Sequence, residues 1–329
     1  MMESKLEYKS ILKNEIQDLV DNKRSVGYKY EAGALSLRRL DDYFVKIGLD
    51  TKELTRNICD SWCSKRSYET IGNQNSRISC LRVLCLYLNE IGIRSYIPPN
   101  GLQKHGLKYD SHIYSKDELI RFFYAVDQSK SVPSECPFRH LVMPLFFRIL
   151  YTSGLRVSEL RLAKIKDFDL EAGFLKVVSG KNNKDRLVPV HPSLVEKCIE
   201  LKREIHSFSS NDEYFFMKFP GEPMSLGNIY KNFRRYLEKA NISHTGKGPR
   251  VHDFRHTYCV NLLKKWIDEK KDLLVYLPYM KTMLGHESFN ETAYYLKLTA
   301  ELFPTIRIKL EKAYPDIIEE VELHEEFFN

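Results

Sequence analysis

Apolar residues recur at helical spacing through the first hundred residues of the chain. Positions three and four apart share one face of a helix, so each recurrence marks a buried stripe. The stripes comprise Ile11, Leu12, Ile16, Leu19 and Val20, then Leu37, Leu40, Tyr43, Phe44 and Ile47, and finally Ile78, Leu81, Leu84, Tyr87, Leu88 and Ile91. The polar run 72–76 precedes the third stripe. This pattern predicts a helical domain at residues 1–97.

The segment 98–111 interrupts this pattern. Pro98, Pro99 and Gly101 favour extended backbone over helix. At about 3.3 Å per residue the segment spans roughly 45 Å when extended. Ser115 and Glu118 then have the spacing of a capped helix start. We therefore expect a linker at 98–111 and a second domain at residues 112–329.

The second domain combines helical segments with one short β region. Residues 141–151 form a strongly apolar helical run. Two β-rich runs, 174–178 and 186–190, flank the polar and basic segment 180–185, which predicts a hairpin. From Pro192 onward the pattern is mostly helical. The expected fold class is mainly α with a small β-hairpin or sheet: a helical N-terminal domain followed by a mixed α/β domain.

Composition narrows the class of protein. The chain has 329 residues, of which 43% are hydrophobic and 29% charged, as in ordinary soluble domains. Its formal net charge of +7 mildly favours a polyanionic partner. No apolar run approaches the roughly 20 residues that span a bilayer, and the N-terminus is too charged for a secretory signal. We expect a cytoplasmic protein without a membrane partner.

The seven cysteines give no sign of a metal site. The pairs Cys59/Cys63 and Cys80/Cys85 fall on helical faces without a flanking histidine. Their number is odd, and packed thiols in a reducing compartment explain them better than disulfides or zinc. We expect no metal, no cofactor and no catalytic cysteine.

Candidate chemistry is concentrated in the second half of the chain. It lies in four short stretches, 154–160, 179–181, 252–257 and 284–286, and in a tyrosine nine residues after the last of them. Taken singly, each stretch is as well explained by a surface or core role. Together they provide two guanidinium groups, an ammonium, two imidazoles and a phenol. The six residues are Arg156, Lys181, His252, Arg255, His286 and Tyr295.

In order and spacing these residues resemble the tyrosine recombinases, the phage-integrase family of site-specific DNA recombinases. The resemblance covers most of the chain. It implies a helical core-binding domain followed by a catalytic domain. It also implies that Tyr295 is the nucleophile, because the family's spacing after Leu284-Gly285-His286 favours it over Tyr294. Tyr294 points about 100° away on a helix, so the two cannot share one role.

The residue types suit attack on a phosphodiester. Arginine stays charged and binds two oxygens at once, which fits Arg156 and Arg255 to the non-bridging oxygens. Lys181, at the hairpin tip, is placed to protonate the departing 5′ oxygen. Attack by the phenol gives a 3′-phosphotyrosine intermediate that conserves the ester, so rejoining needs no ATP.

The remaining residues have supporting roles in this interpretation. His252 and His286 would donate hydrogen bonds to the phosphate or assist proton transfer from the phenol. Glu159, three residues after Arg156 on the same helical face, is placed to orient an arginine or a histidine. The arginine, lysine and histidine side chains would neutralise the phosphate charge that Mg²⁺ neutralises in many nucleases.

The resulting function is site-specific recombination, by integration, excision or transposition of a mobile element. The resemblance implies a homodimer on double-stranded DNA with inverted-repeat half-sites, a homotetramer in synapsis, a Holliday junction and an accessory directionality factor. It places the protein at the nucleoid. A C-terminal helix after Pro304 would dock on a neighbouring protomer or on its own domain. The alternatives are type IB topoisomerase-like relaxation and a non-catalytic DNA-binding scaffold.

Overall fold

The chain divides into two units, Met1–Lys108 and Tyr109–Asn329. The computed structural model describes residues 6–28, 30–99, 111–131, 137–178, 185–219, 221–245, 248–304 and 306–308. Most of the expected linker at 98–111 lies outside these ranges, so the domain bounds stay a prediction. Most of the expected C-terminal helix after Pro304 also lies outside them. None of the helices in the described ranges has the length and apolar run that a bilayer crossing requires.

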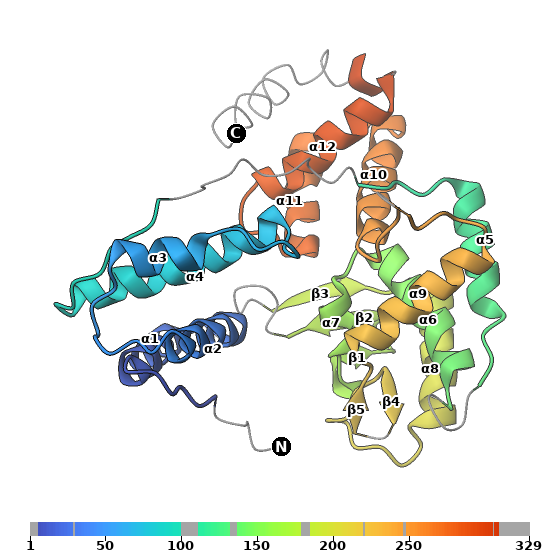
Figure 1. Cartoon of the computed structure of the whole chain (residues 1–329). Helices are drawn as coiled ribbons and strands as arrows, with labels where there is room; N and C mark the ends of the chain where they lie inside the picture. Colours follow the sequence, from blue (N-terminus) through green and yellow to red (C-terminus); the bar gives the residue numbers. More distant parts are fainter. Residues whose placement is uncertain are drawn as a thin grey trace. The chain divides into compact units, whose positions relative to one another are not determined.

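The apolar stripes of the first unit form its core. The described helices here are α1 (Lys13–Ser25), α2 (Glu31–Lys46), α3 (Arg56–Cys63) and α4 (Ile71–Glu90) (Figure 1). The helix α4 contacts the other three, and α1 also contacts α2. Most stripe residues are buried, Tyr43 and Tyr87 are partly buried, and Ile11, Ile47 and Ile91 are exposed.

The polar run 72–76 belongs to α4 and does not precede it. Thr70 is the N-cap, and its Oγ1 accepts a hydrogen bond from the backbone N–H of Asn73 at 3.2 Å. A threonine in this position satisfies an amide at the helix start that has no partner within the helix. The helix therefore begins two turns before its apolar stripe.

The second unit is mainly helical with two small sheets, which confirms the predicted fold class. The described helices are α5 (Lys116–Asp127), α6 (Arg139–Ser153), α7 (Val157–Arg161), the 3-10 helix η1 (Ile165–Asp167), α8 (Pro192–Ile205), α9 (Leu226–Lys239), α10 (Asp253–Asp268), α11 (Leu273–Leu284) and α12 (Asn290–Leu302). The strands are β1 (Phe168–Asp169), β2 (Phe174–Val177), β3 (Arg186–Pro189), β4 (Met217–Phe219) and β5 (Glu222–Pro223). The predicted capping box is present at the start of α5.

The predicted hairpin is part of a three-stranded antiparallel sheet in the order β1-β2-β3. Its register pairs Phe174 with Pro189 and Val177 with Arg186. A second antiparallel pair, β4-β5, was not expected from the sequence. Its strands are two and three residues long, too short for an alternating pattern to be visible.

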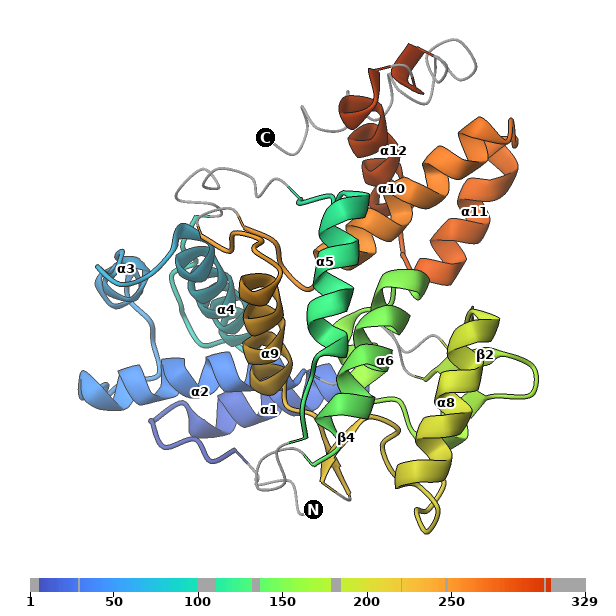
Figure 2. The same ribbon diagram turned by 90° about the vertical axis from the view of Figure 1, so that its right-hand side faces the viewer.

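Helix α6 is the centre of the second unit. It contacts α5, α8 and α10, and Figure 2 shows α5 and α8 on either side of it. Around it lies a cluster of aromatic rings: Phe122 on α5 packs edge-on to Phe147 on α6 with centroids 5.6 Å apart, and Phe254 on α10 lies 5.1 Å from Phe122. This large buried cluster fixes the start of α10 against α6.

Helix α10 connects two hydrophobic cores. Its first turn contributes Phe254 to the large core around α6, whereas Cys259 and Leu263 belong to a smaller core with α11 and α12. Arg255 lies between these two contributions and is only 2% exposed. A charged side chain is thus held where the two cores meet.

Candidate active site

Arg255 is the central side chain of the predicted site. Its Nη1 donates to the carbonyl of Gly154 at 2.7 Å, and its Nη2 donates to the carbonyl of Leu284 at 2.9 Å. Nη2 also lies 2.8 Å from Nε2 of His286. Because a buried guanidinium needs several acceptors, these bonds fix its plane. Arg255 therefore joins the end of α6 to the turn between α11 and α12.

His286 acts as an acceptor toward Arg255. A guanidinium only donates, so Nε2 of His286 carries no proton in this arrangement. The proton is on Nδ1, which donates to Oγ1 of Thr292 at 2.8 Å. The side chain is 4% exposed, and Thr292 is fully buried on α12. His286 is therefore a neutral, oriented imidazole.

Tyr295 lies beside these groups on α12. Its ring stacks on His286, with centroids 5.9 Å apart and planes 10° from parallel, and it is 3% exposed. The phenol interacts with the side chains of Arg255 and Cys259. Burial is the main reason that its pKa is raised, and the opposing charge of Arg255 does not offset it. The phenol is therefore protonated at neutral pH and must lose its proton during attack.

Arg156 is the N-cap of α7, with extended backbone angles. Its relation to Glu159 differs from the expected pairing on one helical face. The Glu159 carboxylate reaches back across the helix start, where Oε2 accepts the backbone N–H of Arg156 and Oε1 accepts Nη1, both at 2.9 Å. A helix N-terminus favours this capping arrangement. Arg156 is 23% exposed at its side chain, so its guanidinium remains open to a ligand.

His252 is exposed at the start of α10, one turn before His256, and their rings meet edge-on at 4.9 Å. Packing around the His252 ring, followed by the positive charges of Arg255 and Arg156, lowers its pKa. His256 is less exposed, and burial followed by the neighbouring His252 and Arg255 lowers its pKa to about 3. Both histidines are neutral at physiological pH, and His252 has an open edge toward solvent.

Two glycines of the predicted motifs have backbone angles that favour glycine. Gly154 ends α6 with φ of 64°, and a Cβ there would lie 2.7 Å from the Tyr258 ring. Gly285 ends α11 with φ of 66°, and a Cβ there would lie 2.9 Å from a guanidinium nitrogen of Arg186. A left-handed C-cap explains glycine in each motif, and close packing explains why nothing larger fits.

The structure separates the two adjacent tyrosines. The Tyr294 hydroxyl lies 3.0 Å from Oγ of Ser111, while Tyr295 is packed against His286. Lys181 lies outside the described residues, so its predicted role stays a prediction. The other five predicted residues meet at the ends of α6 and α11 and along α10 and α12.

Sequence reasoning missed two residues at this site. Arg186 donates through Nη2 to Oε2 of Glu159 at 2.8 Å, and Cys259 contacts the Tyr295 phenol. Alternation along β3 was the available signal for Arg186, since it shares a face with the buried Val188. Cys259 follows Arg255 by four residues, which places both on one face of α10.

Glu159 joins these arginines. Burial by itself would raise the pKa of its carboxyl, but the hydrogen bond and charge of Arg186 and the contacts with Arg156 outweigh burial and lower the pKa. The carboxylate is 7% exposed and ionised at neutral pH. The guanidiniums of Arg156 and Arg186 both face this one carboxylate, and the surplus positive charge suits an anionic ligand.

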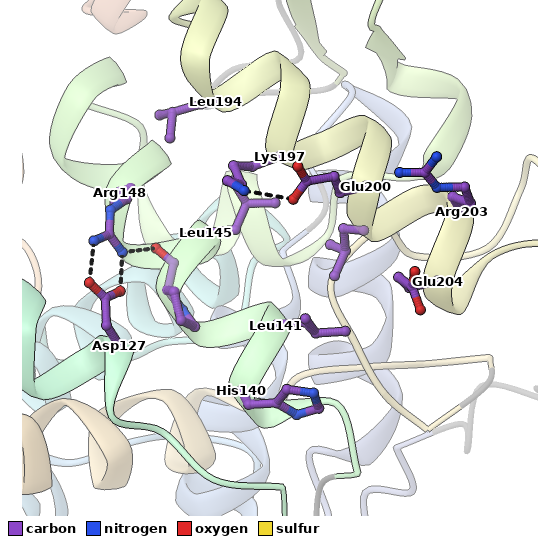
Figure 3. Close-up of a pocket in the computed structure, with 12 residues that line it drawn as sticks. Asp127, His140, Leu141, Leu145, Arg148, Leu194, Lys197, Glu200, Arg203 and Glu204 are labelled. Carbon is purple, nitrogen blue, oxygen red and sulfur yellow. Dashed lines mark hydrogen bonds and ion pairs between the residues drawn. The ribbon is translucent and has the colours of Figure 1, made fainter.

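A cleft of about 610 Å³ elsewhere in this unit is not part of the cluster. Figure 3 shows it between α6 and α8, with Arg148 paired to Asp127 and Lys197 paired to Glu200. None of the five predicted residues that the structure describes lines it. Among the described residues, no group of three or more His, Cys, Asp or Glu side chains is arranged to hold a metal ion.

Comparison with known proteins agrees with this geometry. Residues 116–301 match the model of the phage integrase family. The chain belongs to this family. The match spans more than half of the chain and includes the five described site residues. Membership supports site-specific recombination and does not favour either topoisomerase-like relaxation or a non-catalytic scaffold.

Individual relatives extend the similarity to almost the whole chain. The protein y4rB of Sinorhizobium fredii, named as an integrase/recombinase, is 28% identical over 318 residues, covering 93% of this chain and 99% of y4rB. The tyrosine recombinase XerA of Pyrococcus furiosus is 31% identical over 160 residues, covering 48% of this chain and 50% of XerA. The Tn1549 transposon integrase, solved with circular intermediate DNA, shares the fold with a TM-score of 0.60 at 17% identity, covering 85% and 94% of the two chains.

Proposed function

We propose that this chain recombines DNA at specific sites through a covalent bond between Tyr295 and a 3′ phosphate. The observation that carries the proposal is the bonding of Arg255. The buried guanidinium of Arg255 contacts His286 and lies against the phenol of Tyr295. The arginine that would bind the phosphate, the imidazole and the nucleophile therefore lie together. This arrangement suits in-line attack on a phosphodiester.

The arginines neutralise the phosphate. In Arg255, both N–H groups of Nη2 are used by the bonds to Leu284 and His286. One of the two N–H groups of Nη1 is used by the bond to Gly154. The second Nη1 proton and the Nε proton remain for the phenol and the non-bridging oxygens. Arg156 contributes a second, more exposed guanidinium, and the open edge of His252 faces the same oxygens. Fixed donors of this kind stabilise the charge of a pentavalent phosphorus without reorganising.

The phenol proton needs an acceptor, because burial keeps Tyr295 protonated. Nε2 of His286 is an unprotonated nitrogen in the ring that stacks on Tyr295. When phosphate oxygens draw the Arg255 guanidinium toward the substrate, this nitrogen becomes available to accept the proton. Lys181 then supplies the proton for the departing 5′ oxygen. The new tyrosyl ester conserves the energy of the original bond, so the reverse attack by a 5′ hydroxyl reseals the strand.

The assembly follows from two strand exchanges. We propose a dimer on inverted half-sites of double-stranded DNA, a tetramer that pairs two sites, and a Holliday junction between the exchanges. The predicted domains at 1–97 and 112–329, with the linker 98–111, would enclose the duplex from two sides. The protein would act at the nucleoid in the cytoplasm, with an accessory factor that sets direction and a C-terminal helix that links protomers.

Covalent trapping tests the proposal. A duplex selected for tight binding from a randomised library is nicked at successive spacer positions, so that a short fragment diffuses away after cleavage and traps the adduct. Wild type, Tyr295→Phe and the matched neighbour Tyr294→Phe are compared on a denaturing gel. We expect an adduct from wild type and Tyr294→Phe and none from Tyr295→Phe. Loss only in Tyr294→Phe would move the nucleophile, and no adduct on tightly bound DNA would refute the catalytic function.

A further inference from the structure

Arg186, the first residue of β3, contacts two separate segments of the second unit. Its Nη2 donates to Oε2 of Glu159 at 2.8 Å, and its Nε donates to the carbonyl of Met283 at 2.8 Å. Its guanidinium also packs against Gly285, at 2.9 Å from the position of a Cβ there. The side chain is only 7% exposed. A single guanidinium therefore connects the sheet to α7 and to the turn after α11.

Each of these contacts leads to a residue of the candidate site. Glu159 binds both the backbone N–H and the guanidinium of Arg156. Met283 and Gly285 lie just before His286 in the chain. Moving Arg186 would thus disturb Arg156 through Glu159, and His286 through the backbone of the turn.

Charge adds a second consequence. Glu159 carries one negative charge and faces two guanidiniums, so the trio has a surplus positive charge. Without Arg186, the Glu159 carboxylate would be shared with Arg156 alone, and this pair would be neutral. The attraction of Arg156 for a phosphate would then fall, even if its position did not change.

Resting on the function proposed above, we propose that Arg186 is a positioning residue for DNA cleavage. It holds Arg156 through Glu159, and it holds His286 through the turn at Gly285. We assign Arg186 no contact with the phosphate, because Nη2 donates to Glu159, Nε donates to Met283 and Nη1 packs on Gly285. An arginine is needed because one planar fork spans two acceptors that a lysine ammonium cannot reach together.

The test measures the rate of adduct formation with the nicked duplex in excess protein. Arg186→Gln is expected to slow the rate about 100-fold, the effect of a shift of about 1 Å in a catalytic group, with DNA affinity within about twofold of wild type. Arg186→Lys should recover part of the rate. Arg148→Gln is the matched control, because Arg148 also pairs with one carboxylate, Asp127, and donates to one backbone carbonyl, that of Pro144. Its rate should equal that of wild type.

A double-mutant cycle separates positioning from general loss of structure. In an Arg156→Lys background the site has already lost the fork that Arg186 positions. Adding Arg186→Gln there should slow the reaction much less than it slows wild type. An equal slowing in both backgrounds would overturn the proposal, as would an Arg186→Gln rate equal to wild type. If the Gln variant melts below the assay temperature, Arg186→Lys carries the same cycle.

The outcomes also distinguish this inference from the function on which it rests. Absence of an adduct from wild type on tightly bound DNA refutes recombination itself. An adduct from wild type and from Arg186→Gln at equal rates refutes only the role of Arg186.

Discussion

Replacing Gly285 with alanine should impair cleavage more than stability alone explains. Gly285 ends α11 with φ of 66°, and an alanine Cβ there would lie 2.9 Å from Nη1 and 3.0 Å from Cζ of Arg186. Heavy atoms cannot approach this closely, so the guanidinium of Arg186 must shift. Its bonds to Glu159 and Met283 would then lengthen or break.

The magnitude follows from two effects. An L-residue in the left-handed region costs about 1 kcal/mol of unfolding free energy. Loss of a hydrogen bond to a charged group costs about 2 kcal/mol more. For a unit of this size, each kcal/mol lowers Tm by about 2–4 °C, so Gly285→Ala should lower Tm by about 6–12 °C. Cleavage should slow about 100-fold, since the turn carrying His286 moves with the guanidinium.

Gly221 provides a matched control. It also has a positive φ, of 80°, but a Cβ there meets nothing within 4 Å. Gly221→Ala should therefore show only the backbone strain, with a fall in Tm of about 2–4 °C and an unchanged cleavage rate. Thermal melting and single-turnover trapping measure both quantities. If Gly285→Ala cleaves as fast as Gly221→Ala, the link from Gly285 through Arg186 to the site is wrong.

Two further outcomes are expected. Thr292→Val removes the hydroxyl that accepts from Nδ1 of His286 at 2.8 Å. Because the imidazole is then no longer oriented, adduct formation should slow about tenfold. Trapping kinetics should show this slower rate with unchanged DNA affinity. His256 has a pKa lowered to about 3, so the folded chain binds fewer protons than the unfolded chain between about pH 3 and the ordinary pKa of 6.5. Its contribution to stability is therefore complete above pH 6.5 and is lost as pH falls toward 3. Urea melts across this range should show that the free energy of unfolding falls less steeply with decreasing pH in His256→Gln than in wild type.

Local sequence signals predicted much of the fold. The apolar stripes located α1, α2 and α4, and the spacing of Ser115 and Glu118 predicted the capping box of α5, because these signals depend on contacts within a few residues. The mainly α class with a small hairpin followed from the same reasoning. The apolar stripe did not locate the start of α4, because the polar first turns of this helix are stabilised by the cap and carry no hydrophobic pattern. The β4-β5 pair was missed because its strands are too short.

The residues of the candidate site could be selected from the sequence, but their contacts could not. Arg156, Arg255, His286 and Tyr295 were recognised from motif order, which records residue type and spacing. Which acceptor each donor meets depends on how α6, α10, α11 and α12 pack around two cores. That packing places Arg255 between the carbonyls of Gly154 and Leu284 and makes His286 an acceptor.

Arg186 shows the difference between what the sequence and the tertiary structure determine. In the sequence it is one of many basic residues near a hairpin, with only strand alternation to suggest that it faces inward. In the fold it bonds to Glu159, 27 residues away, and to Met283, 97 residues away. Sequence alone determined the residue types and the local helices, since propensity and spacing are local properties. The tertiary structure alone decided which charges meet, because burial and long-range contact set their partners.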